Sequence, residues 1–160
     1  MKHDLATVAY IAGLLDGEGH LAIERTLPGK GLLRIVNPHY GVRVTISNTH
    51  KPTLEWIQSM WGGRLNSQKI GVRQRHYNWS ISNRHIVTEF VATMLPHLRI
   101  KRDQAELLLD YLASITVKRS YGRATMPISE ATLRQDYHER MLALRRPQRL
   151  NEQPPAERLG

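Results

Sequence analysis

Two carboxylates interleaved with glycines, Asp16-Gly17-Glu18-Gly19, follow an apolar segment that starts near Leu5. A helix that stops here would explain the glycines, because glycine readily takes the left-handed conformation found just after a helix. It would not explain the carboxylates, since the C-terminal end of a helix is already negative and an exposed acid there costs about 0.3–1 kcal/mol. A hard cation bound to carboxylate and carbonyl oxygens would reverse that unfavourable effect. The turn is therefore a candidate metal site.

The segment from Leu5 to Leu15 must position this turn, and apart from Thr7 it is apolar on every side. A helix without a polar face is normally buried, and this segment is far shorter than the roughly 20 residues needed to cross a bilayer. Asp4 is placed to cap its N-terminus. One side carries almost no side chain, which allows a second backbone to approach closely. The small residues on that side are Ala6, Ala9, Ala12 and Gly13.

The composition limits the classes of protein that remain. A chain of 160 residues is large enough for one domain with a sizeable core. The absence of cysteine excludes disulfides and thiolate zinc sites, and the eight histidines include no i, i+4 pair of the zinc-protease kind. The N-terminus lacks the layout of a secretory signal peptide, so we expect an intracellular protein that is not secreted.

The charge points to a polyanionic partner, because the formal net charge is +9 and the isoelectric point is about 10.3. Between Thr26 and Thr88 there are nine Lys or Arg residues and one acid, Glu55. Arginine outnumbers lysine, and its planar guanidinium suits phosphates and the guanine edge. A basic face that is only solvated is the alternative interpretation.

Period-two alternation follows the acidic turn and places Leu21 and Ile23 on one side of a half-buried strand. A second strand is expected from Tyr40 to Ser47. Arg34 lies before it, in a stretch from Leu32 to His39 that could form a long hairpin arm.

The later elements follow from caps, glycines and prolines. They are a helix opened by Pro52 and stopped at Gly62-Gly63, a hairpin of Arg64–Lys69 and Val72–Ser82, a helix from the Asn83 cap to Leu95, a helix from Arg102 to Val117, and one from Ser129 to about Arg146, with Ile128 and Leu133 as a hydrophobic staple. This order predicts an α+β fold, αββαββα, with a four-stranded antiparallel sheet, helices on one face and additional C-terminal helices. We expect one domain over residues 1–146 and a disordered tail over residues 147–160.

The sheet face without helices is expected to be rich in arginine and amide side chains. It would carry His20, Glu24, Thr26, Arg43, Thr45, Asn66, Gln68, Arg73, Arg75, Asn78 and Ser80, with Arg34 nearby. A two-stranded ribbon fits the major groove of DNA, where Arg reads guanine and Asn or Gln reads adenine. A merely solvated sheet face remains the alternative.

The stretch from Ala12 to Gly19 matches the core of a long motif position by position, with Glu18 at an acidic place where aspartate is the other usual choice. The chain thereby resembles the LAGLIDADG homing endonucleases, over roughly residues 5–117. The resemblance implies a saddle-like sheet, double-stranded DNA as the partner, and staggered double-strand breaks at a long pseudo-palindromic site. It also implies a gene within an intron or intein.

The resemblance assigns roles to further residues. Glu18, helped by the carbonyl of Gly17, would bind Mg²⁺ or another divalent cation such as Mn²⁺. Asn48 falls where the family orders solvent near the scissile phosphate, and Lys101 where it places a basic residue; a turn asparagine and a surface lysine are the alternatives. Asp16 is expected to cap the turn.

In the family that the chain resembles, a single motif per chain implies a homodimer, in which the thin helix side at Ala9, Ala12 and Gly13 would meet its two-fold copy. Neither a membrane nor a small-molecule substrate is expected. Three other hypotheses stay open: a non-cleaving DNA-binding protein on the same scaffold, an RNA maturase suggested by Arg145-Arg146-x-x-Arg149, and a ribosomal-type basic structural protein.

Overall fold

A computed structural model describes residues 4–27, 37–70, 74–115 and 126–145. The elements in chain order are α1 (Leu5–Glu18), β1 (Gly19–Thr26), β2 (His39–Asn48), α2 (Lys51–Trp61), β3 (Arg64–Ile70), β4 (Gln74–Ile81), α3 (Arg84–Met94), a 3-10 turn η1 (Leu95–His97), α4 (Arg102–Ser114) and α5 (Ile128–Arg145). The predicted α+β fold is therefore confirmed. Arg34, Arg73 and the expected tail at 147–160 lie outside the described residues.

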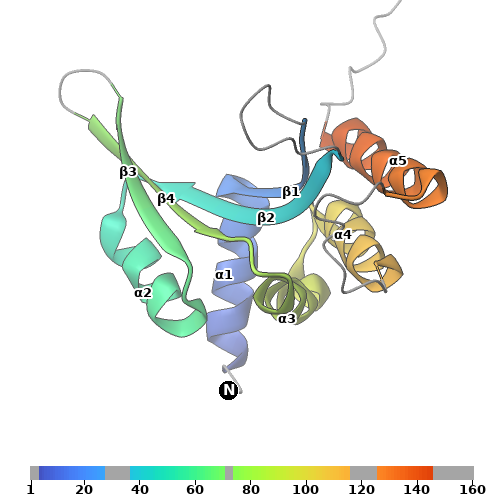
Figure 1. Cartoon of the computed structure of the whole chain (residues 1–160). Helices are drawn as coiled ribbons and strands as arrows, with labels where there is room; N and C mark the ends of the chain where they lie inside the picture. Colours follow the sequence, from blue (N-terminus) through green and yellow to red (C-terminus); the bar gives the residue numbers. More distant parts are fainter. Residues whose placement is uncertain (1–3, 28–36, 71–73, 116–125, 146–160) are drawn as a thin grey trace, which may run out of the picture.

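The four strands form one antiparallel sheet in the order β1-β2-β4-β3. The two hairpins meet along β2 and β4, where Val44 is opposite Ile81. Figure 1 shows α1, α2 and α3 on one side of the sheet, with α4 and α5 beside its β1–β2 end. Within the described ranges, no helix crosses the opposite side of the sheet at β2 and β4.

The core lies between the sheet and α1–α3, as the period-two pattern predicts. Trp79 and Phe90 are fully buried, and their ring centroids are 5.3 Å apart. The indole N–H of Trp79 donates to the carbonyl of Gly62 (2.8 Å). Gly62 and Gly63 have φ values of 66° and 90°, so the predicted glycine stop after α2 is confirmed.

The predicted beginnings and ends of the helices are confirmed in part. The Asn83 side chain accepts from the N–H groups of His85 (3.0 Å) and Ile86 (3.4 Å), as expected of a helix cap. Helix α3 ends at Met94, one residue before the expected end at Leu95. The 3-10 turn η1 follows directly and includes Pro96. The expected staple is wrong: Ile128 is the first residue of α5 and is 85% exposed.

Helix α5 braces the β1–β2 end of the sheet through polar contacts. The hydroxyl of Tyr40 donates to Oε1 of Gln135 (2.7 Å), and Nδ1 of His138 lies 2.6 Å from the carbonyl oxygen of Ile23. The buried side chain of Met141 adds an apolar contact from α5 to the core. These contacts fix the edge strand β1, which starts directly after the acidic turn.

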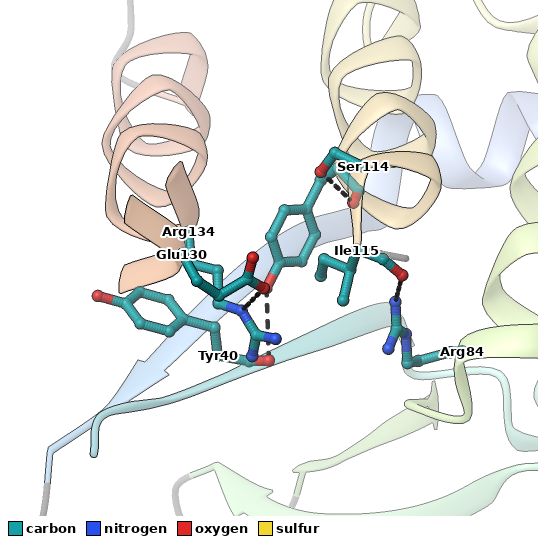
Figure 2. A network of polar contacts seen from close by, with 7 residues as sticks. Tyr40, Arg84, Ser114, Ile115, Glu130 and Arg134 are labelled. Carbon is teal, nitrogen blue, oxygen red and sulfur yellow. Dashed lines mark hydrogen bonds and ion pairs between the residues drawn. The ribbon is translucent and has the colours of Figure 1, made fainter. Parts of the chain in front are cut away.

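Figure 2 shows the centre of this brace, where Arg134 and Glu130 of α5 form an ion pair (2.7 Å) above Tyr40. The hydroxyl of Tyr111 donates to the carbonyl of Tyr40 (3.5 Å). Burial raises the pKa of Tyr111 to about 12, so this hydroxyl stays protonated at neutral pH. None of the helices in the described parts of the chain is long and apolar enough to cross a bilayer.

Candidate metal site and nucleic-acid interface

The acidic turn is the last turn of α1, and β1 begins at the next residue. Gly19 ends the helix with φ −90° and ψ 163°, and neither Gly17 nor Gly19 has a positive φ. The left-handed conformation that would have explained these glycines is therefore not adopted at either position. Gly19 is required for space instead, because a Cβ atom on it would lie 2.3 Å from the carbonyl oxygen of Leu15.

Asp16 is 8% exposed, and its carboxylate is held by backbone donors far away in the chain. Three consecutive N–H groups donate to it, from Arg99 (2.7 Å), Ile100 (3.2 Å) and Lys101 (2.9 Å). Burial alone would raise the pKa of Asp16, but these donors and the Lys101 ammonium outweigh it and hold the pKa below its ordinary value. Asp16 therefore caps a remote loop rather than its own turn.

Lys101 lies against the end of α1. Its ammonium donates to the backbone carbonyl of Asp16, one of the helix-terminal oxygens without a helical partner. A cation at this end of a helix also interacts favourably with the helix dipole. Lys101 is at the same time the N-cap residue of α4 and makes no side-chain cap of its own. The structure thus places the predicted basic residue beside the acidic turn.

Glu18 has surroundings opposite to those of Asp16. It is exposed, and no ion pair or side-chain hydrogen bond involving it is found among the described residues. Gly17 is also exposed, and a Cβ atom there would have no neighbour within 4 Å. No three His, Asp or Glu side chains of the described residues cluster closely enough to hold a metal ion. One protomer therefore presents a carboxylate and a neighbouring carbonyl, but not a full set of side-chain ligands.

The outer face of α1 only partly matches the predicted thin side. Ala9 and Gly13 are exposed, and a Cβ atom on Gly13 would have no neighbour within 4 Å. Ala12 is 0% exposed and belongs to the core of the protomer, because it lies on the side of α1 with Val8 and Leu15. Ala12 therefore cannot contribute directly to a surface between copies.

Asn48 ends β2, two residues beyond Ile46, which is opposite Gly19 in the β1–β2 register. Its Oδ1 atom accepts the N–H of His50 (2.8 Å), which is the geometry of a turn asparagine. This bond occupies the oxygen and leaves the amide NH₂ group as a donor. The register therefore places Asn48 near the acidic turn. Asn48 alternates with Val44 and Ile46, so its position is on the side of the sheet that the helices cover.

The sheet register tests the predicted polar face. Ten of the predicted positions on the strands are described, and nine of them alternate away from the core. The positions on the polar face are His20, Glu24, Thr26, Arg43, Thr45, Asn66, Gln68, Asn78 and Ser80.

The exception is Arg75, which is opposite Lys69 in the β3–β4 register. Arg75 is four residues before Trp79 in β4, so the two positions are on the same face of the sheet. Its predicted place on the polar face is wrong, because a strand turns successive side chains to opposite faces. Counting outward from the buried Trp79 gives His76 instead. The same count gives Arg64, opposite Ser80, which the sequence analysis also missed.

Two pairs of side chains organise the polar face. Arg43 and Glu24 form an exposed ion pair across β1 and β2 (2.9 Å). The hydroxyl of Ser47 donates to Oδ1 of Asn78 (2.5 Å), across β2 and β4. Ser47 alternates with Arg43 and Thr45, so strand periodicity alone could have added it to the predicted set.

His20 is half-buried on the polar face, one residue beyond the acidic turn. Burial and the guanidinium of Arg145 lower the pKa of His20, although Glu24 acts in the opposite direction. The ring is therefore mostly neutral at pH 7 and can both donate and accept a hydrogen bond. Arg145 at the end of α5 was predicted only as part of a basic cluster; its proximity to His20 depends on the packing of α5.

Solved structures of homing endonucleases resemble this fold. The homing endonuclease I-CvuI in complex with the I-CreI target gives a TM-score of 0.69 and 18% identity, over 92% of this chain and 87% of that chain. The archaeal intron-encoded homing endonuclease I-Vdi141I complexed with DNA gives 0.69 and 14%, over 88% and 85%. The LAGLIDADG homing endonuclease I-GzeII in complex with its DNA target gives 0.59 and 14%, over 81% and 42%.

Comparison with protein-family models and with curated proteins gave no match. The likeness therefore rests on three-dimensional structure, and the chain has the fold of the LAGLIDADG homing endonucleases. The I-CvuI complexes were solved in the presence of 2 mM Mg, with the DNA not cleaved, and of 2 mM Ca. A shared fold does not by itself define an activity, which has to be argued from the site.

Proposed function

We propose that this protein is a sequence-specific DNA endonuclease of the LAGLIDADG homing type. It would make a staggered double-strand break at a long pseudo-palindromic site by metal-dependent phosphodiester hydrolysis. The observation that carries the proposal is Glu18, an exposed carboxylate without an ion-pair partner in the described structure, at the junction of α1 with a polar sheet face.

Double-stranded DNA is the partner that fits this face best. The sheet is narrow, twisted and open on the side that carries Arg43, Asn66 and Asn78. Such side chains read base edges when strands lie in the major groove. The net charge of +9 adds a favourable interaction with phosphates. Solved structures of this fold contain DNA, which agrees with the proposal.

Magnesium or manganese fits the donors at the acidic turn. Glu18 would supply a carboxylate oxygen, and Gly17 would supply its backbone carbonyl. Both residues are exposed, so neither has to leave the protein interior to reach an ion. The remaining ligands would come from DNA phosphates and from Glu18 of a second copy. When bound, the ions stabilise the attacking and leaving oxygens of the hydrolysis.

Asn48 and Lys101 would act on the attacking water and on the charge of the scissile phosphate, respectively. Asn48 would orient the attacking water through its amide NH₂ group, because Oδ1 already accepts from His50. Lys101 would compensate negative charge near the scissile phosphate while its ammonium is held at the carbonyl of Asp16. No covalent intermediate with the protein is part of this proposal.

The active form would be a homodimer joined through the outer face of α1. Exposed Ala9 and Gly13 let a second backbone approach, and a two-fold contact supplies an identical helix. This arrangement would bring the two Glu18 carboxylates together, where divalent cations compensate their repulsion. Gly13→Leu should give monomers in light scattering with an unchanged protomer fold, because a Cβ atom at this exposed position has no neighbour within 4 Å. A dimer that survives this change would refute the packing.

The expected setting follows from the substrate. We propose an intracellular protein that works on DNA, encoded within an intron or intein, and without a membrane or small-molecule partner. The single-domain assignment to residues 1–146 remains part of this proposal.

A selection of cleaved sites from a random duplex library tests the function. The selected site should be cut with Mg²⁺ and left intact with EDTA. A wild-type protein that binds a duplex tightly but never cuts it would support the non-cleaving alternative. Tighter binding to host intron RNA than to duplex DNA would instead support the maturase alternative.

A further inference from the structure

Asp16 joins two parts of the chain that are more than 80 residues apart. Its carboxylate takes all three consecutive N–H groups of the segment that opens α4, from Arg99 to Lys101. It also lies at the positive end of α4, whose N-cap residue has no capping side chain of its own. The contact therefore fixes the start of α4 directly onto the end of α1.

The same contact determines where the Lys101 ammonium lies. The Lys101 backbone donates to Oδ1 of Asp16, and its side chain turns back to the carbonyl of Asp16. Backbone and side chain are thus both anchored to one residue, two positions before Glu18. A lysine with four rotatable side-chain bonds is normally mobile, and this double anchor removes much of that freedom.

We infer that Asp16 is a positioning residue for the reaction, which acts by holding the Lys101 ammonium at the end of α1 beside the scissile phosphate. This inference rests on the proposed endonuclease function. Asp16 does not bind the metal ion, because its carboxylate oxygens are taken by the three backbone donors and it is 8% exposed. Its removal should release Lys101 from the site while Glu18 stays in place.

A double-mutant cycle separates this role from a purely structural one. Asp16→Asn should reduce the single-turnover cleavage rate about 10–100-fold, the usual loss when a residue that orients a site is removed. In a Lys101→Ala background the same change should cost less than about threefold, because the two residues act as one unit. The Asp16→Asn change should alter DNA affinity measured in EDTA by less than about threefold in either background, since Asp16 itself makes no phosphate contact.

Two further variants keep the test decisive. Asp110→Asn is the matched control, because it removes an exposed carboxylate from α4 and should leave the cleavage rate unchanged. Asp16→Glu keeps the charge but shifts the carboxylate by one methylene, and it should repeat the loss and the non-additivity if Asp16→Asn does not fold. Equal losses in both backgrounds, or a parallel loss of DNA affinity, would overturn the inference.

Failure of the proposed function would be recognised separately. If the wild-type protein cuts no duplex with Mg²⁺ or Mn²⁺, the endonuclease proposal fails whatever Asp16 does. Amide hydrogen exchange then tests the anchor alone: Arg99, Ile100 and Lys101 should exchange faster in Asp16→Asn than in Asp110→Asn. Unchanged protection of those three amides would overturn the positioning role.

Discussion

Asp16 and Glu18 are two residues apart in the last turn of α1, yet their carboxylates lie in opposite environments. Asp16 is buried and accepts three backbone hydrogen bonds, with the Lys101 ammonium beside it. Glu18 is exposed, with no ion pair in the described structure. The C-terminal end of a helix disfavours both charges, but the protein itself compensates only one of them.

This difference indicates separate roles for the two carboxylates. Asp16 stabilises the fold, and Glu18 remains available to a ligand. The N-terminal end of α4 and Lys101 neutralise Asp16, so its carboxylate contributes to the stability of one protomer. Glu18 gains nothing comparable from its own chain. Its unfavourable position is explained if DNA-bound divalent cations complete the site, as we propose.

Replacement of Glu18 tests this division most strongly. Glu18→Gln should reduce the cleavage rate by about 10³-fold or more, because a bound metal ion supplies several kcal/mol of transition-state stabilisation. DNA affinity in EDTA and the midpoint of urea unfolding should remain at the wild-type values. Cleavage assays, binding assays and unfolding on the same preparation check all three. A simultaneous loss of folding would show that Glu18 is structural after all.

Asp16 should show the reverse pattern in stability. Asp16→Asn should lower the free energy of unfolding at pH 7 by about 2–4 kcal/mol, since hydrogen bonds to a buried charged group are lost. The folded-state pKa of Asp16 is depressed, so its contribution is complete above the unfolded-state pKa and is lost as the pH falls through the folded-state pKa. The difference between wild type and variant should therefore be full at pH 7 and shrink below about pH 4. A difference independent of pH, in urea unfolding, would contradict this role.

The two glycines of the turn extend the comparison. Gly19→Ala should destabilise the protomer by about 1–3 kcal/mol, because the new Cβ atom would overlap the Leu15 carbonyl and force a shift. Gly17→Ala should be neutral or slightly stabilising for the protomer, since its Cβ atom meets nothing and alanine favours a helix. Thermal unfolding of the two variants measures the contrast. Equal effects would mean that the end of α1 is not held as described.

Much of the fold could be predicted because its signals are local. The Asn83 cap, the Gly62-Gly63 stop and the alternation of β2 each depend on a few neighbouring residues. The acidic turn also stands out locally, and it forms the last turn of α1, which ends at Glu18. What the sequence could not show is which acid is already compensated, since the partners of Asp16 are 83 to 85 residues away.

Other errors came from register and packing. Ala12 has the same small side chain as Ala9, and only the packing of α1 decides that it faces inward. Arg75 was placed on the polar face although strict alternation from Trp79 excludes it. A shift of one residue along a strand moves its side chains to the opposite face of the sheet. The error therefore lies in the assumed register and not in the residue types.

The two faces of the β3–β4 hairpin can be compared in the same way, with a smaller expected effect. Arg64 and Arg75 are both exposed arginines of the β3–β4 hairpin, but only Arg64 alternates onto the polar face. Arg64→Ala should weaken DNA binding by about 1 kcal/mol per copy and lower the slope of affinity against salt by about one. Arg75→Ala, the matched control, should have less than half of this effect. Titrations of the selected duplex at several salt concentrations measure both, and equal losses would show that the hairpin contacts DNA with both faces.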